Sequence, residues 1–536
     1  MKMNTRYRIM ILVFLVLASG SILVRLPSTL ASRLGRLPPT DRGTLARRVA
    51  VRAAPFEPGS VHRPQRSPVS PPGDPWPGKE EIVLEPELLR ALLEAGPRDH
   101  LRVIVHLRDQ ADLESGVAVL QDVVETRVRV VSALKAHAAR SQVSLRAYLE
   151  EAQAAGTVES YTPFWIFNGV AVRAHPAVIR ALAARPDVAA VRLDRWRRWI
   201  SGPAPVHVQP QTSAVEWNVA RVRADQVWAA LRITGTGAVV AGMDTGADWF
   251  HPALQANYRA YNPHGPSNHL YSWYDATGSG ALYPVDGHGH GSHTLGSAVG
   301  GGGIGVAPGA QWIAVRVLNS QGMGYDSWIH AGFQWILAPG GDPNQAPGVV
   351  NCSWGNKNGS LVTFQPDLRA LRAGGIFVVF SAGNEGPARG AVGSPASLPQ
   401  AFAVGATDFD DEVANFSSRG PSPWGEVRPH VTAPGVGVRS SLPGGAYGAA
   451  NGTSMAAPHV TGLVALLRSV SPTLTITRVA FILTSTAVPV GDPVPNYDAG
   501  WGRIDALAAV AGLSRSGLLT GTVTRAGDQI PIAGAR

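Results

Sequence analysis

A hydroxyl at the start of a helix is the arrangement in this sequence best suited to chemistry. Asn451, Gly452 and Thr453 have the composition of a turn, and the residues from Ser454 to about Val470 have the apolar spacing of a helix. The first N–H groups of a helix have no partner inside it, and the helix dipole is positive at that end. These groups can stabilise an oxyanion beside the serine, as acyl transfer requires. The alternative is that Thr453 or Ser454 only caps a buried helix.

Three further motifs lie upstream of this serine. They are DTG at 244–246, HGSH at 290–293 and SAGNEGP at 381–387, and the serine itself lies in GTSMAAPHV. In type and order these motifs resemble the subtilisin-like serine proteases, the subtilases, over roughly residues 215–512. Phrases such as GVAPGAQWIAVRVL and SSRGPSPWGEVRPHVTAPG are most similar to the bacillopeptidase F branch of that family.

The resemblance implies a role for each polar residue. Ser454 would be the nucleophile, and His290 would be the base that takes its proton. Asp244 would hold the imidazole in the required tautomer. Asn384 would donate a side-chain N–H to the oxyanion, together with the backbone N–H of Ser454. Met455 follows the serine, so its oxidation to the sulfoxide would bring a polar oxygen to the site and partly inactivate the enzyme.

Each of these residues also has a simpler interpretation. Asp244 alone is typical of a turn, and Asn384 alone is typical of a loop. His288, His290 and His293 form an H-x-H-x-x-H pattern that in isolation suggests a metal site. No thiolate cluster or carboxylate trio accompanies the histidines in the sequence, so we favour the protease interpretation, in which four motifs agree and His293 is structural.

The same resemblance locates the walls of a substrate cleft. SWG at 353–355 and SAG at 381–383 would form the two edges of the main specificity pocket, and a small residue at 393 would leave it deep. Such a pocket suits medium or large apolar side chains before the scissile bond. Extended substrates would add a strand to the cleft through main-chain hydrogen bonds. The residues expected to bind substrate are Ser353, Trp354, Gly355, Ala382, Gly383, Gly322, Gly324 and Gly393, of which Trp354 replaces a smaller aliphatic residue and would narrow one subsite.

Buried parallel strands are expected to position these residues. Helical segments separate five apolar runs of strand length, at 237–244, 311–318, 348–354, 375–382 and 401–406. This alternation predicts an α/β fold with a doubly wound parallel sheet, whose sites lie at the carboxyl ends of the strands. Asp244, Ser353 and Asn384 all lie at such ends.

A smaller α+β unit is expected at residues 82–200, before the catalytic domain at 215–512. Its predicted elements are strands at 101–107, 167–174 and 188–194 and helices within 114–154 and 176–185. This succession favours a ferredoxin-like β-α-β-β-α-β layer. It is similar to the propeptide of subtilases, which assists folding and inhibits the enzyme until it is removed. The alternative is an independent binding domain.

The segments between and outside these two units have their own patterns. Residues 201–214 are rich in prolines and small polar residues and are predicted to form an exposed linker, with processing between about Trp196 and Glu216. Residues 1–31 have the basic start and apolar run of a secretory signal, with an uncleaved membrane anchor as the alternative. Residues 32–81 form a Pro/Arg-rich linker, and 513–536 look like the start of a truncated β-sandwich of the carboxypeptidase-regulatory type.

The charge distribution argues against a nucleic-acid-binding protein. The formal charge is +9, but residues 1–200 hold 29 basic and 19 acidic residues, whereas residues 201–536 hold 18 and 19. The enzyme-like part is therefore nearly neutral. The single cysteine, Cys352, cannot form an internal disulfide and is expected to be a small buried apolar residue.

No cofactor is required for the expected chemistry, but structural calcium is a separate question. Ala253 occupies the position at which many subtilases carry a calcium-binding aspartate, so that site is in doubt. Other candidate carboxylates for a hard cation are Asp248, Asp408, Asp410, Asp411 and Glu412. The alternative for residues 408–412 is a solvated acidic turn.

The sequence as a whole predicts a secreted, extracellular or cell-surface serine endopeptidase. Its expected partners are protein or peptide substrates and its own propeptide, and it would contact a membrane only if the N-terminal segment stayed uncleaved. Two competing functions remain at this point. One is a catalytically silent scaffold used for binding, and the other is an esterase or transpeptidase that uses the same acyl-enzyme.

Overall fold

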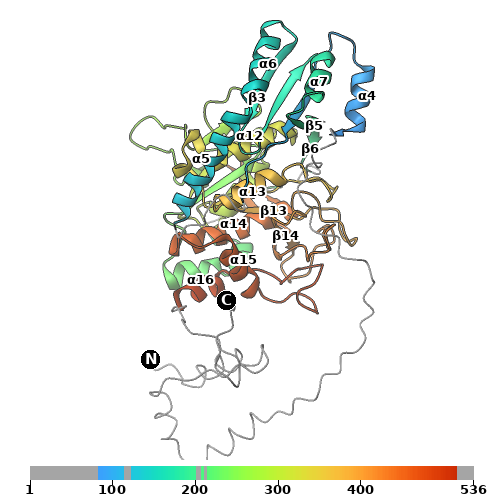
Figure 1. Cartoon of the computed structure of the whole chain (residues 1–536). Helices are drawn as coiled ribbons and strands as arrows, with labels where there is room; N and C mark the ends of the chain where they lie inside the picture. The colour runs from blue at the N-terminus through green and yellow to red at the C-terminus, as the bar shows by residue number, and fades with distance from the viewer. Residues whose placement is uncertain (1–82, 114–121, 201–206, 210–213, 516–536) are drawn as a thin grey trace, which may run out of the picture. The chain divides into compact units, whose positions relative to one another are not determined.

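The computed structural model of this chain describes residues 83–113, 122–200, 207–209 and 214–515 (Figure 1). All of these residues belong to one unit of the chain, which spans residues 68–515. None of the described helices combines the length and the apolar character needed to span a bilayer. The signal, the Pro/Arg-rich linker and most of the expected β-sandwich lie outside the described residues.

The first part of the described chain is the predicted ferredoxin-like unit. Its five-stranded sheet has the order β1-β5-β2-β4-β3, in which only β1 and β5 pair in parallel. The strands are β1 Val83–Leu84, β2 Leu101–Leu107, β3 Val158–Phe164, β4 Gly169–Ala174 and β5 Val188–Leu193. The helices are α4 Pro86–Glu94, α5 Val123–Ser141, α6 Val143–Ala154 and α7 Pro176–Ala183. We call this unit, with the residues that follow it up to Ile200, the pro-domain.

The second part, at residues 214–515, contains the predicted parallel sheet, and we call it the catalytic part after the domain that the sequence predicts here. Seven strands follow the order β15-β14-β13-β12-β8-β10-β9, and every neighbouring pair is parallel. The strands are β8 Val239–Asp244, β9 Trp273–Asp275, β10 Gln311–Arg316, β12 Val349–Cys352, β13 Phe377–Ser381, β14 Phe402–Thr407 and β15 Val431–Pro434. The principal helices are α11 His290–Val299, α12 Asp326–Leu337, α13 Gln365–Ala373, α14 Thr453–Val470, α15 Ile476–Ser485 and α16 Ala506–Arg515. Shorter helices are α8 Trp217–Arg221, α9 Ala224–Gln226, η1 Val227–Leu231, α10 Pro252–Gln255, η2 Pro339–Gly341 and η3 Pro343–Gln345.

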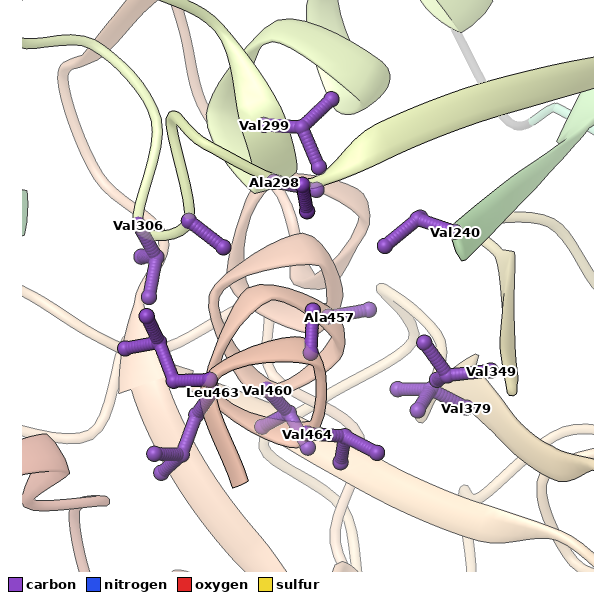
Figure 2. Close-up of a cluster of buried hydrophobic side chains, with 14 of the residues drawn as sticks. Val240, Ala298, Val299, Val306, Val349, Val379, Ala457, Val460, Leu463 and Val464 are labelled. Atoms are coloured by element: carbon purple, nitrogen blue, oxygen red, sulfur yellow. The ribbon is translucent and has the colours of Figure 1, made fainter. Parts of the chain in front are cut away.

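The sheet is covered on both faces, which explains why its strands are continuous apolar runs. Successive residues of β8 point to opposite faces, so Val240 packs in one core cluster and Ala241 and Met243 pack in the other. Figure 2 shows the first cluster, where α14 packs against strands and α11 through Ala457, Val460, Leu463, Val464, Val240, Val349, Val379, Ala298 and Val299. The second cluster contains α12, α13 and also Val130, Val131 and Leu134 of the pro-domain helix α5. The pro-domain therefore shares a hydrophobic core with one face of the catalytic part.

Two small sheets complete the described structure. β6 Trp196–Arg198 pairs with β11 Met323–Tyr325, and β7 His207–Gln209 pairs with β17 Ala446–Ala450, which also pairs with β16 Val438–Leu442. The expected linker at 201–214 thus contains a strand, because backbone groups of β17 are available to pair with it. At the other end, α16 continues to Arg515, beyond the expected domain boundary at 512.

Candidate active site

The side chains of Asp244 and His290 are in direct contact. Asp244 is the last residue of β8, and His290 is the first residue of α11. His290 Nδ1 lies 2.8 Å from Asp244 Oδ1, and both side chains are 2% exposed. Burial alone would lower the pKa of His290, but the charge and hydrogen bond of Asp244 and the charge of Asp286 raise that pKa above its usual value. A neutral imidazole held in this way donates from Nδ1 and leaves Nε2 as a base.

Asp286 organises the loop before His290, and the sequence analysis did not single it out. One of its oxygens accepts from the hydroxyl of Thr245, and the other accepts from both the N–H and the hydroxyl of Ser292 at 2.8 Å. It also accepts from the backbone N–H groups of His288 and Gly289. An acidic residue four positions before His290, just ahead of a helix, is a pattern typical of local side-chain capping, and this pattern could have revealed Asp286.

A glycine allows α11 to begin so close to β8. A Cβ atom added to Gly291 would overlap the carbonyl oxygen of Gly246. The N–H of Gly291 also donates to the hydroxyl of Thr245 at 2.9 Å. The second residue of the HGSH motif is therefore required by the packing of the helix start against the DTG turn.

Ser454 is the second residue of α14, so the helix begins one residue earlier than predicted. Its hydroxyl donates to the backbone carbonyl of Ser353 at 2.9 Å, and the hydroxyl of Ser353 donates to the carbonyl of Ser454 at 2.8 Å. In the described part of the chain no hydrogen bond joins Ser454 to His290. For His290 to accept the proton of Ser454, the serine hydroxyl would first have to turn away from Ser353.

Asn384 binds the first residue of the same helix. Its Oδ1 accepts from both the N–H and the hydroxyl of Thr453 at 2.9 Å. Because the oxygen is engaged in this way, the amide nitrogen is the group left to donate elsewhere. That nitrogen lies beside Gly452, next to the start of α14. Asn384 and Ser454 also line one pocket.

The three histidines do not converge on one point, so the metal interpretation of their spacing is not supported. His293 Nε2 lies 3.1 Å from each of two backbone carbonyls, those of Val438 and Gly448. Burial lowers the pKa of His293 to about 4, which keeps it neutral. Within the described ranges, no three His, Cys, Asp or Glu side chains form a group suited to a metal ion.

Three of the five acidic residues considered for calcium have other partners. Asp411 pairs with Arg503 at 2.7 Å and with Arg221 at 2.9 Å. Asp408 accepts backbone N–H groups of its own turn, and Asp248 accepts those of Phe250 and Gly444. Among the described residues, none of the five belongs to a group of three acidic, histidine or cysteine side chains suited to a metal ion. Cys352 is buried, and burial raises the pKa of its thiol.

The expected substrate-binding residues fall into two groups. One group lines a pocket with Asn384 and Ser454 and consists of Ser353, Trp354, Gly355, Ala382, Gly383 and Gly393. Trp354 is buried, and its indole N–H donates to the carbonyl of Met243 at 2.7 Å. A Cβ on Gly393 would overlap the carbonyl of Asn356, so the packing of the backbone by itself requires this glycine. Gly322 and Gly324 form the second group, at β11.

The last residues of the pro-domain occupy the cleft between these two groups. β6 pairs antiparallel with β11, and the N–H of Trp199 then donates to the carbonyl of Gly322 at 3.0 Å. On the opposite edge, the N–H of Gly355 donates to the carbonyl of Trp199 at 3.1 Å. Trp199 and Ile200 are buried and contribute to the wall of the pocket that contains Ser454. Pairing on both sides is the arrangement expected for an extended peptide in a strand-binding cleft.

Comparison with known proteins agrees with this geometry. Residues 235–502 match the subtilase family, and residues 102–199 match the peptidase inhibitor I9 family. The chain is 39% identical to bacillopeptidase F of Bacillus subtilis over 434 residues, which cover 75% of this chain but only 30% of that protein. It is 34% identical to subtilisin E of Bacillus subtilis over 65% of this chain and 81% of that protein, and 38% identical to a subtilisin of Bacillus pumilus over 52% and 92%. The chain therefore belongs to the subtilase family of serine proteases.

Proposed function

We propose that this protein is a secreted serine endopeptidase whose pro-domain keeps it inactive until it is cleaved. Ser454 is the nucleophile, His290 is the general base, and Asp244 fixes and stabilises the imidazole. The observation that carries this assignment is the buried Asp244–His290 contact of 2.8 Å at the carboxyl end of a central strand. The N-terminus of α14, which contains Ser454, lies at the same edge of the sheet.

The proposed reaction begins when the Ser454 hydroxyl leaves the carbonyl of Ser353 and gives its proton to His290 Nε2. The serine oxygen then attacks the peptide carbonyl, and the carbonyl oxygen becomes an oxyanion. The side-chain amide of Asn384 and the N–H of Ser454 donate to it, because the first N–H groups of a helix lack partners within the helix. His290 returns the proton to the leaving amine, and water hydrolyses the acyl-enzyme.

The walls of the cleft favour broad specificity. The edges of the cleft bind substrate mainly through backbone groups of Gly322, Gly324 and Gly355. Such groups can pair with an extended peptide of almost any sequence. The pocket beside Ser454 is lined largely by backbone and small residues, so we propose that it accepts a medium or large apolar side chain. The substrates are then unfolded or flexible protein segments.

The pro-domain is proposed to inhibit the enzyme by occupying this cleft. Besides the pairing of β6, the buried Arg127 of α5 donates to the carbonyl of Gly374 at 2.9 Å, and Asp194 accepts from the N–H and hydroxyl of Ser327 at the start of α12. Ile200 is held in the cleft before residue 201, and β7 is paired with β17 after residue 206. We therefore narrow the expected processing site to the residues between, 201–206.

Labelling with a fluorophosphonate tests whether the site is catalytic. The processed wild-type chain should be labelled at Ser454, because only an activated serine reacts rapidly with this reagent. A silent scaffold would stay unlabelled, and that result would overturn the proposal. An esterase or transpeptidase would be labelled too. Two further assays separate these activities from that of an endopeptidase. One measures casein hydrolysis, and the other measures whether a peptide acyl-enzyme reacts with water or with added amines.

Peroxide is expected to inactivate the processed enzyme partly and slowly. Met455 is 1% exposed and packs near Val438 and Ala450, so oxidant reaches it less readily than a surface methionine. Once formed, the sulfoxide would place a polar oxygen beside the oxyanion site. As oxidation proceeds, the residual activity should fall while the oxidised fraction of Met455, measured by peptide mapping, rises. The Met455→Ala variant should keep its activity in peroxide. Equal inactivation of both proteins, or full activity after Met455 is oxidised, would contradict the prediction.

A further inference from the structure

The pro-domain strand shows how side chains of a bound peptide meet the cleft. Alternate residues of a strand point to opposite sides. Along β6 and the residue after it, Trp196 and Arg198 are exposed, whereas Arg197 and Trp199 face the catalytic part. Trp199 is buried against Trp354 and Phe364, with ring centroids 5.5 and 5.7 Å apart. The ring of Trp196 is partly exposed, and it also lies 4.7 Å from that of Tyr325 and 5.3 Å from that of Trp328. The two inward positions of the strand, Arg197 and Trp199, are two residues apart.

The other inward position faces a carboxylate. Arg197 Nε lies 3.1 Å from Oδ1 of Asp326, and the two side chains are 18% and 4% exposed. Asp326 is the first residue of α12, where the positive end of the helix dipole favours a negative charge. Its backbone N–H donates to the carbonyl of Arg195, which fixes the strand beside it. Recognition of the residue at position 197 thus combines main-chain pairing of the strand with the fixed negative charge of Asp326.

The neighbouring arginine provides an internal contrast. Arg198 is exposed, and its guanidinium donates to the backbone carbonyl of Gln321 at 2.9 Å, with no ion pair to any of the described residues. Such a contact at the surface selects weakly, since solvent replaces it at little cost. The ion pair of Arg197 with Asp326 is largely removed from solvent. Loss of the arginine charge would leave the Asp326 carboxylate in the cleft without a positive partner. Only one of these two arginines should therefore matter for recognition.

Asp326 belongs to the catalytic part and remains there after the pro-domain is removed. We propose that Asp326 is a specificity-determining residue that selects substrates with an arginine two residues before the aromatic or large apolar side chain held where Trp199 lies. The inference rests on the proposed function, because it treats β6 as bound in the manner of a substrate. The preferred substrates are extended, basic protein segments with the pattern arginine, any residue, aromatic.

Internally quenched peptides that span residues 195–208 test this selection without assuming which bond is cut. One peptide has the native sequence, a second has citrulline in place of Arg197, and a third has citrulline in place of Arg198. Citrulline keeps the shape of arginine and removes its charge. Each is assayed with the processed wild type and with Asp326→Asn at pH 8, since burial raises the pKa of Asp326 to about 6 in the precursor.

The wild type should cleave the Arg197-to-citrulline peptide with a kcat/KM about 10-fold below that of the native peptide, as expected for a partly buried ion pair. Citrulline at 198 should cost less than about 2-fold, because Arg198 is exposed and faces a backbone carbonyl instead of a carboxylate. Asp326→Asn should lose the preference at 197, and Asp326→Glu should recover part of it. Ratios between peptides within one enzyme do not depend on how much of a variant is folded.

Two results overturn the inference. One is equal cleavage of the native peptide and the Arg197-to-citrulline peptide by the wild type, and the other is an unchanged preference in Asp326→Asn. If the wild type hydrolyses casein but not the native peptide, the inference fails and the proposed function stands. If it hydrolyses neither casein nor any peptide and is not labelled by fluorophosphonate, the proposed function itself is wrong.

Discussion

Replacing Ser454 with alanine is expected to leave the chain as an uncleaved precursor and to lower turnover on the order of 10⁶-fold, the size of loss known for the same change in subtilisin. The alanine cannot form the acyl-enzyme, whereas Asp244, His290 and the oxyanion donors remain. Expression of both proteins, followed by N-terminal sequencing and casein assays, measures processing and activity together. The mature wild type should begin between residues 201 and 207, as expected for processing at 201–206.

A serine in the same helix provides the control. Ser469 lies near the end of α14, and its hydroxyl donates only to the carbonyl of Leu466 at 2.8 Å. Ser469→Ala removes an equivalent hydroxyl far from the cleft and should process normally. If Ser454→Ala matured to the same N-terminus at the same rate in the absence of other proteases, Ser454 would not be the nucleophile.

Replacing Asp244 with asparagine is expected to lower kcat about 10⁴-fold, as for the equivalent acid of other Ser-His-Asp triads. The pH profile should change as well. In the wild type, kcat/KM should fall as the pH drops through a pKa above the usual 6.5 of histidine, because a protonated His290 cannot accept the serine proton. In Asp244→Asn the burial of His290 remains but the opposing charge is lost. The apparent pKa should therefore move to lower pH.

A second buried acid–imidazole pair offers a matched control for this prediction. His330 Nδ1 lies 2.9 Å from Asp367, with both side chains at most 1% exposed, on the other face of the sheet. Asp367→Asn removes a buried charge of the same kind and should affect stability without moving the pH profile. A profile that is flat from pH 5 to 8 in the wild type, or unshifted in Asp244→Asn, would contradict the role assigned to Asp244.

Local sequence patterns determined the elements and their order. The apolar runs that end near Asp244, Ser353 and Asn384 could be recognised because a strand buried on both faces must be apolar throughout. The succession of strands and helices before residue 200 predicted the ferredoxin-like layer for a similar reason, since side-chain periodicity depends only on the local backbone. The motifs around Asp244, His290 and Ser454 identified the candidate triad through their resemblance to a family.

Contacts between distant segments could be found only in the tertiary structure. Asp286 acts through hydrogen bonds to Thr245 and Ser292, and β7 is a strand only because β17 lies beside it. The ion pair of Arg197 with Asp326 joins residues 129 positions apart. No local periodicity records such pairings, because each of them joins segments that only the folded chain brings together. The sequence thus determined which residues could do the chemistry. The packing of α11 and α14 on the parallel sheet decided which of them meet, and the packing of the pro-domain on the same sheet decided what fills the cleft.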